Sequence, residues 1–439
     1  MSERSKIFES FEKYKDYTDE RVKGGIEKYR KGDINIKVTD ADGKSVKNAK
    51  ITLKQTNHEF KHGANLFMLD EFDTEEKNEA YKEHFAKAFN MATLPFYWDS
   101  TEPEKGKTRY DKNSPKLYRR PPIDLCIEFC EKHNIEPREH ALAYDHMFPA
   151  WLKGASLDEV KENYERRCKE ISERYADKIR TIEVTNEHFW IDGKTALYDE
   201  DDFIEYCFKT TRKYFPKNQL CINEWSEFWR EAARKRTRYY LNIENSIKNG
   251  APIDAIGMQF HMFTKQESEE AYTKQAYNPD HVFKVLDLYS NFNLPIQITE
   301  ITIPAYTDKK EDEEIQAKLI KNMYSIWFSH KNVEQIIYWN LPDGYAAFAP
   351  QGDMTAGENY YRGGLLRYDL SPKPAYDVIY DLFHKEWITN AEILTDCEGN
   401  AKTRGFYGEY DVQICADGKC VNSKINFSKN NGNEFSFSI

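Results

Sequence analysis

Ile182-Glu183-Val184-Thr185-Asn186-Glu187 and Ile296-Gln297-Ile298-Thr299-Glu300 are the two stretches of this sequence that decide its fold. Each is a β-type apolar run that ends on a glutamate. A carboxylate that closes a buried strand is held rigidly by the strand, and it stays accessible at the mouth of a barrel or open α/β sheet. The two stretches therefore predict an α/β architecture that presents Glu187 and Glu300 at one mouth.

Outward from these stretches, short apolar runs alternate with helical segments. The eight runs span residues 60–66, 91–94, 139–144, 179–184, 219–222, 255–259, 296–301 and 336–339. Strands that alternate with helices indicate a parallel sheet. A (β/α)8 barrel typically takes about 250 residues and often more. We therefore predict a (β/α)8 TIM barrel over residues 58–385 of the 439-residue chain.

Both ends of the chain differ in character from this central part. Residues 1–31 predict a charged helical segment, and residues 32–57 alternate around an Asp42-Gly43 turn, which predicts a β-hairpin. Residues 386–439 contain further short strands broken by Gly, Asn and Asp. Neither β segment is large enough to bury a core alone. We expect the two segments to pair into one small accessory β-sandwich.

The composition limits the classes of partner. The formal net charge of −11 argues against a nucleic-acid partner, because phosphate binding depends on clustered Lys and Arg. No apolar run approaches the length of about 18 residues that would indicate a membrane partner. No leader is visible after Met1, so we expect a cytoplasmic protein as written, or a secreted one if the chain has been trimmed. A monomer and a neutral carbohydrate partner are expected.

Nothing in the sequence predicts a metal or a cofactor. The eight cysteines show no paired Cys-x-x-Cys spacing, and His140, Asp145 and His146 are spaced irregularly. His146 is therefore interpreted as structural. Cys415 and Cys420 flank a turn across which they could pair, although two ordinary unpaired strand positions are the favoured interpretation.

Polar and aromatic residues gather where the predicted strands end. Candidates for substrate contact are Asn186, Asn223, Gln259, His261 and Trp339, together with Trp98, His140, Tyr144 and Asp145 after the second and third strands. His140 is equally consistent with a hydrogen-bonded core histidine. Glycoside hydrolysis needs one protonated carboxyl group and one ionised one, about 5 to 5.5 Å apart when configuration is retained. Glu187 and Glu300 therefore predict a retaining glycosidase.

Several motifs recur in a fixed order: Trp98-Asp99-Ser100-Thr101-Glu102-Pro103, Asn186-Glu187, Gly257-Met258-Gln259-Phe260-His261, Thr299-Glu300-Ile301 and Pro372-Lys373-Pro374-Ala375-Tyr376. Together they resemble glycoside hydrolase family 10, the (β/α)8 endo-β-1,4-xylanases. The resemblance implies that Glu187 is the general acid/base and Glu300 the nucleophile. It also implies that Asn186 binds the sugar 2-hydroxyl, that Gln259 and His261 orient Glu300, and that Trp339 lies beneath the sugar.

The chain departs from the family pattern on the glycone side. The strand-two stretch Ala92 to Trp98 lacks the Glu, Asn and Lys that hold glycone sugars in the family. Tyr144-Asp145 stands where the family has Trp-His, and Thr302 stands where it has the Asp that pairs with the strand-six histidine. These departures imply a substituted or non-xylan β-linked saccharide, in a pocket reshaped by Phe96, Tyr97, Tyr144 and Asp145.

Three functions follow from these observations. The favoured one is a retaining β-glycosidase of xylanase type that hydrolyses xylan or xylo-oligosaccharides by double displacement. The second is a glycosidase on the same scaffold that acts on a decorated oligosaccharide or glycoconjugate. The third is a non-catalytic carbohydrate-binding barrel.

Overall fold

The computed structural model describes residues 3–190, 193 and 195–439. Its centre is a closed barrel with the strand order β10-β3-β4-β5-β6-β7-β8-β9, and all neighbours pair in parallel. The strands are β3 (Lys61–Asn65), β4 (Met91–Pro95), β5 (Glu136–His140), β6 (Thr181–Asn186), β7 (Gln219–Glu224), β8 (Ala255–His261), β9 (Ile296–Thr302) and β10 (Val333–Tyr338). The predicted (β/α)8 barrel is confirmed.

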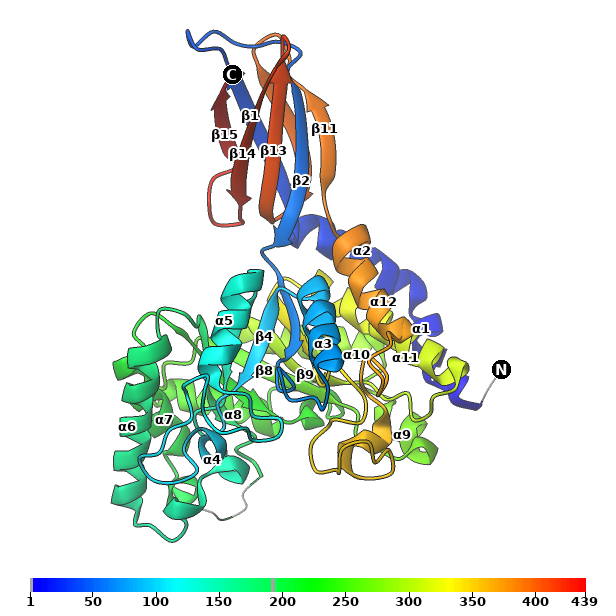
Figure 1. Ribbon diagram of the computed structural model, residues 1–439. Helices are drawn as coiled ribbons and strands as arrows, with labels where there is room; N and C mark the ends of the chain where they lie inside the picture. The colour runs from blue at the N-terminus through cyan, green and yellow to red at the C-terminus, as the bar shows by residue number, and fades with distance from the viewer. Residues whose placement is uncertain (1–2, 191–192, 194) are drawn as a thin grey trace.

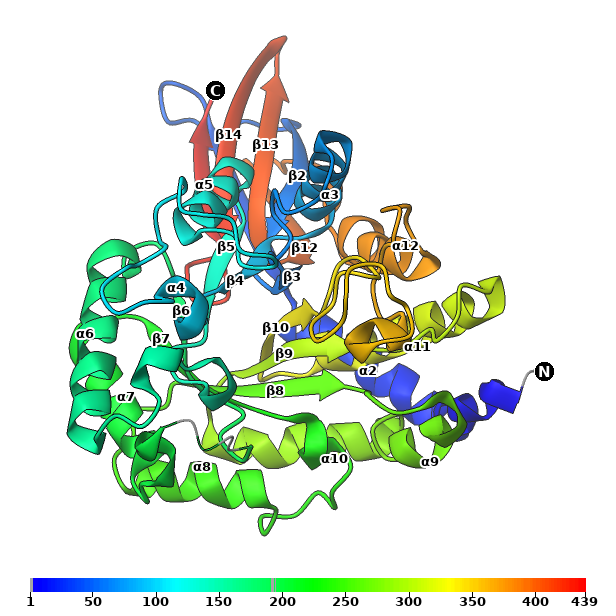
Figure 2. The ribbon, with the colours of Figure 1, turned by 60° about the horizontal axis from the view of Figure 1, so that its bottom comes forward.

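Helices connect the strands and lie around the outside of the barrel (Figure 2). The longer ones are α3 (Glu75–Ala88), α5 (Ile123–His133), α6 (Leu157–Tyr175), α7 (Phe203–Tyr214), α8 (Arg238–Lys248), α10 (Pro279–Tyr289), α11 (Lys310–Ser329) and α12 (Pro374–Asp381). Shorter ones are α4 (Trp98–Thr101) and α9 (Glu269–Thr273), and α1 (Glu9–Lys13) and α2 (Lys15–Tyr29) precede the first strand. Among the described residues, no helix combines the length and the apolar character needed to cross a bilayer.

Burial explains why the barrel strands are visible in the sequence. All six residues of β6 and all seven of β9 are buried, as expected for parallel strands covered on both faces. Strand β5 agrees least well with its predicted run, because it covers Glu136–His140 whereas the sequence predicted 139–144. Its buried charges, Arg138 and Glu139, hide it from a search for apolar runs.

The two ends of the chain form a sandwich of two sheets, which stands at one end of the barrel (Figure 1). One sheet has the order β12-β1-β15 and the other β11-β2-β13-β14. Their strands are β1 (Lys31–Thr39), β2 (Lys50–His58), β11 (Asn390–Leu394), β12 (Asn400–Phe406), β13 (Gly408–Ala416), β14 (Lys419–Phe427) and β15 (Glu434–Ser438). Alternate apolar residues such as Ile34, Ile36, Ile51, Leu53 and Val412 form the core between the sheets.

Two predictions about this sandwich are wrong. The predicted hairpin of residues 32–57 does not form, because β1 pairs with β12 and β15 whereas β2 pairs with β11 and β13. The turn at Asp42-Gly43 is present, but local pairing ends at the bridge between Thr39 and Ser45, and the chain then crosses to the other sheet. Cys415 and Cys420, which were expected to be unpaired, form a disulfide across the β13–β14 hairpin, where they are direct partners in the register.

Arg30, at the end of α2, connects the sandwich to the barrel. Its Nη2 donates to the carbonyl oxygens of His330 and Val333, each at 2.6 Å, and its Nε donates to Phe328 O. These carbonyls precede or begin β10. The sandwich therefore packs against the amino-terminal end of the barrel strands, and their carboxyl ends at the opposite mouth stay clear of it (Figure 1).

Candidate active site

A cavity of about 380 Å3 opens at the carboxyl ends of the barrel strands. This volume lies within the range of small-molecule sites, about 300 to 1,000 Å3. Its lining comes from strand ends and from loops: Phe67, Tyr97, Arg119, Arg120, Tyr144, His146, Met147, Asn186, Glu187, Trp225, His261, Phe263, Glu300, Trp339, Ala347, Phe348, Gly357, Glu358 and Tyr361. Both predicted catalytic glutamates lie in this cavity.

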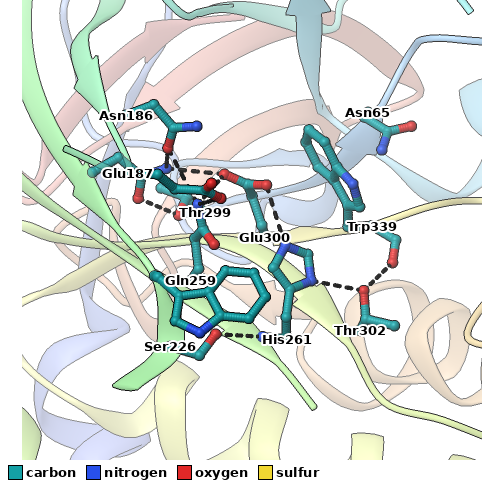
Figure 3. A network of polar contacts seen from close by, with 12 residues as sticks. Asn65, Asn186, Glu187, Ser226, Gln259, His261, Thr299, Glu300, Thr302 and Trp339 are labelled. Atoms are coloured by element: carbon teal, nitrogen blue, oxygen red, sulfur yellow. Dashed lines mark hydrogen bonds and ion pairs between the residues drawn. The ribbon is translucent and has the colours of Figure 1, made fainter. Parts of the chain in front are cut away.

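Gln259 joins the two glutamates. Its Nε2 donates to Glu187 Oε1 and to Glu300 Oε1, at 2.9 Å in each case (Figure 3). Because one nitrogen is equally close to both oxygens, these oxygens can be no further apart than twice that distance. Glu187 follows β6 directly and has a φ of 48°, in the left-handed region that is strained for a side chain of this kind.

Asn223 on β7 holds Glu300 and the neighbouring Asn186. Its Nδ2 lies 3.0 Å from Glu300 Oε1 and 3.0 Å from Asn186 Oδ1, and its Oδ1 accepts a 2.7 Å hydrogen bond from Thr299. Asn186 Oδ1 also accepts from Gln259 at 3.2 Å. With its oxygen occupied in this way, Asn186 directs its amide NH2 group away from the network (Figure 3).

A chain of hydrogen bonds sets the protonation of His261. Thr302 Oγ1 donates to the carbonyl oxygen of Trp339 at 2.7 Å, so it accepts from His261 Nδ1 at 2.9 Å. Nδ1 is therefore protonated, and Nε2 faces Glu300 Oε2 at 3.2 Å.

Burial raises the pKa of Glu187, and the negative charge of Glu300 raises it further. Hydrogen bonds from Gln259 Nε2 and from the Tyr144 hydroxyl, which lies 2.8 Å from Glu187 Oε2, act in the opposite direction. The net effect favours a protonated Glu187 beside Glu300.

Beneath the cavity lies a layer of paired charges. Arg138 and His140 both contact Glu183, with His140 Nδ1 at 2.8 Å from Glu183 Oε1, and all three are buried. His140 Nε2 contacts the Tyr97 hydroxyl at 2.9 Å. His140, Glu183 and Glu300 offer atoms within 4.8 Å of one another, but both nitrogens of His140 already have protein partners. We therefore assign this layer to support of the cavity floor.

The predicted substrate contacts separate into two groups. Asn186, Tyr144, His261 and Trp339 line the cavity with the two glutamates, and so does Tyr97. Asn223, Gln259 and His140 lie behind the lining and hold it in place.

Three further predicted positions also lie outside the lining. Trp98 is 1% exposed and packs in the barrel core, where its Nε1 donates to Glu102 Oε2 at 2.9 Å. Phe96 and Asp145 are each 0% exposed and do not line the cavity. Trp98 begins α4 and Asp145 begins a 3-10 turn, and none of the three side chains reaches the cavity lining, which speaks against their predicted contact with substrate.

Sequence reasoning missed several lining residues, most of them on loops. His146, interpreted as structural, lines the cavity beside Tyr144. Arg119 and Arg120 come from the segment before α5, and Phe348 and Glu358 come from the long loop after β10. No periodicity in the sequence of that last loop marks which of its side chains face inward.

A second hollow lies next to the catalytic cavity. It has a volume of about 330 Å3, and it shares Trp225 with the catalytic cavity. Trp190, which is 53% exposed, lies edge-on to Trp225 with ring centroids 6.4 Å apart. Glu224 lines this hollow, and burial raises its pKa to about 8.

A closed (β/α)8 barrel whose mouth holds two carboxyl groups joined through one amide is typical of the barrel-type glycoside hydrolases. The sequence profile described as glycosyl hydrolase family 10 matches residues 54–382 of this chain. The chain belongs to this family.

Individual relatives are distant. An anti-sigma-I factor, RsgI6, from Acetivibrio thermocellus is 24% identical over 92% of this chain and 47% of its own length. Endo-1,4-beta-xylanase 2 from Arabidopsis thaliana is 22% identical over 90% of this chain and 33% of its own length. The chain thus spans about half or less of these relatives. Xylanase 10B from Thermotoga petrophila, solved with xylobiose, matches 75% of this chain and 95% of its own with a TM-score of 0.59 and 22% identity.

Proposed function

We propose that the protein is a retaining β-glycosidase of xylanase type. The observation that carries this proposal is the shared contact of Gln259 Nε2 with Glu187 and Glu300 at 2.9 Å each. This contact keeps the nearest oxygens of the two carboxyl groups closer together than the separation of roughly 6.5 Å or more found in inverting enzymes. It agrees with the separation of about 5 to 5.5 Å found in retaining enzymes. Such a pair can act on a single anomeric carbon.

In the first step the Glu300 carboxylate attacks the anomeric carbon while Glu187 gives its proton to the departing glycosidic oxygen. In the second step Glu187, now ionised, takes a proton from water, and the resulting hydroxide releases the sugar from Glu300. Formation of the ester removes the negative charge of Glu300. Because that charge helps to raise the pKa of Glu187, its loss prepares Glu187 to act as a base.

The free NH2 group of Asn186 is suited to donate to the sugar 2-hydroxyl, a contact that strengthens in the transition state. The Trp339 ring, 5% exposed and edge-on to Phe67, offers an apolar floor. Curated relatives named endo-1,4-beta-xylanase support xylan or xylo-oligosaccharide as the substrate class. The wall formed by Tyr97 and Tyr144 in place of the family's polar contacts supports a glycone other than plain xylose.

The test compares the protein with its Glu300→Gln variant on aryl β-xylosides and on linear and substituted xylo-oligosaccharides. We expect loss of at least about 10^4-fold in kcat for the variant, since no nucleophile remains. Release of the product with retained configuration, followed by NMR, completes the assignment. Equal turnover by both proteins would show that Glu300 is not the nucleophile.

A non-catalytic carbohydrate-binding barrel is the second candidate. It is favoured by the relative named an anti-sigma-I factor, which matches 92% of this chain. In that case neither the parent protein nor its Glu300→Gln variant would turn over any glycoside, while both would bind saccharide in calorimetric titration.

A further inference from the structure

Arg120 brings a guanidinium group into the catalytic cavity without a carboxylate partner. Among the described residues it forms no ion pair, and its guanidinium donates one hydrogen bond, from Nη1 to Arg119 O at 2.9 Å. An arginine has five N–H donors. Burial lowers the pKa of Arg120, and the nearby Tyr97, Asp99 and Tyr144 only partly oppose this effect.

Two aromatic rings fix this guanidinium in place. Its Cζ lies 4.3 Å from the ring centroid of Tyr97 and 5.5 Å from that of Phe67. Tyr97 is itself held by the hydrogen bond of its hydroxyl to His140. A stacked guanidinium is preorganised, so it loses little side-chain freedom when a ligand binds.

Arg119 makes the same wall more positive, but it is anchored to the protein. Its Nη2 donates to Asn340 Oδ1 at 3.0 Å and its Nη1 donates to Tyr345 O. Its Nε is buried without a hydrogen-bond partner among the described residues. Arg119 therefore holds the loop against the β10 side of the barrel and leaves the half-buried Arg120 as the available donor.

The carboxyl groups of the cavity do not neutralise Arg120. Glu187 and Glu300 are bound to Gln259, Tyr144, Asn223 and His261. Glu358 contacts Asn340 Nδ2 at 3.5 Å, and burial raises its pKa, although Arg119 partly opposes this. None of the three lies within ion-pair distance of either arginine in the described part of the chain.

We propose that Arg120 is a binding site for the carboxylate of an acidic sugar, such as a glucuronosyl substituent on a xylo-oligosaccharide. The proposal rests on the glycosidase function and names its substrate class. A planar guanidinium binds a carboxylate through two parallel hydrogen bonds, which neutral hydroxyls cannot match in strength. Arg120 stands on the strand-two side of the mouth, where the family's Glu, Asn and Lys are missing, so the acidic group would belong to the glycone.

Binding is measured by isothermal titration in the Glu300→Gln background, which prevents hydrolysis. The probes are a xylo-oligosaccharide with one glucuronosyl group, its carboxyl-reduced form, and the unsubstituted oligosaccharide of equal length. A charge-assisted hydrogen bond contributes about 1.5 to 3 kcal/mol, which converts to a preference of about 10- to 100-fold for the acidic probe. We expect Arg120→Gln to remove this preference and Arg120→Lys to keep part of it.

Lys116→Gln is the matched control. Lys116 lies on the same segment, but its Nζ donates to Asp70 O away from the cavity, so the preference should persist in this variant. Equal affinity for the acidic and reduced probes, or a preference that survives Arg120→Gln, would overturn the proposal. Turnover of aryl xylosides by the parent protein is measured separately, so the glycosidase assignment is tested independently of the role of Arg120.

Discussion

The Tyr144 hydroxyl donates to Glu187, the carboxyl group proposed to deliver a proton, so a single residue adjusts the acidity of the site. Its hydrogen bond to Glu187 Oε2 at 2.8 Å stabilises the ionised form and lowers the pKa of Glu187, against the larger effect of burial. Tyr144 stands where the family has a tryptophan, so this adjustment is a property of this chain.

Replacing Tyr144 by Phe removes the hydrogen bond and raises the pKa of Glu187. Because Glu187 is active as an acid in its protonated form, the alkaline limb of the kcat/KM profile should move upward, by about one pH unit. The measurement is the pH dependence of aryl xyloside hydrolysis. Tyr361→Phe lines the same cavity without contacting Glu187 and should leave the limb in place. A limb that moves downward in Tyr144→Phe would contradict the assigned hydrogen bond.

Some residues of the site are predictable because a strand carries them. Glu187 and Glu300 close buried runs, so their position at the mouth follows from the alternation of strands and helices. Arg120 and Glu358 could not be predicted, since irregular loops carry them and their direction depends on tertiary contacts. The sequence shows that Thr302 replaces the family's Asp. It does not show that the Thr302 hydroxyl accepts from His261 and donates to the Trp339 carbonyl oxygen.

Strands β5 and β6 show how charge can be built into the interior of a barrel. Arg138 and Glu183 face each other with no exposed surface on either side chain, and His140 completes the group. Burial alone would raise the pKa of Glu183, yet Arg138 and His140 lower it, so the carboxylate stays ionised. Removing one member of such a group leaves an uncompensated charge.

Arg138→Met should therefore lower the free energy of unfolding by about 3 to 5 kcal/mol, measured by urea denaturation. Adding Glu183→Gln should recover part of the loss, because the orphaned charge disappears. Arg180→Met is the matched control: Arg180 pairs with Glu334 but is 51% exposed, so its loss should change stability by about 1 kcal/mol or less. Similar losses for Arg138→Met and Arg180→Met would refute the role of burial.

Strand β5 also shows why some elements of the barrel are hard to predict from the sequence. Seven of the barrel strands coincide closely with apolar runs, whereas β5 was placed several residues late because its paired charges resemble a loop. The hairpin error has a related cause. A turn sequence predicts a local reversal, but only long-range packing decides whether the strands that follow it share a sheet.

Across the whole molecule, the sandwich and the catalytic mouth occupy opposite ends of the barrel. The amino-terminal face of such barrels contributes to stability, and the carboxyl face to function. Arg30 is one polar link between the sandwich and that stabilising face, with three carbonyl acceptors on the segment that leads into β10.

Arg30→Met should remove a donor from each of these carbonyls, of which His330 O keeps the N–H of Val333, and destabilise the protein by about 2 to 3 kcal/mol, seen as a lower Tm in calorimetry. The value of kcat/KM at 25 °C should stay within about twofold, since the mouth is remote. Arg404→Met, which removes a 42% exposed arginine paired with Glu27 and Asp33, should change Tm little. A large fall in kcat/KM without a change in Tm would contradict this separation.

The interleaving of both chain ends in the sandwich has a consequence for biosynthesis. Strand β2 lies in register between β11 and β13, and β1 between β12 and β15, so neither early strand has its neighbours until the barrel has been translated. At about 5 to 20 residues per second, the roughly 330 residues between β2 and β11 take some 15 to 65 s to emerge. Throughout that interval β1 and β2 expose unpaired edges on the nascent polypeptide, which makes them natural targets for ribosome-associated chaperones.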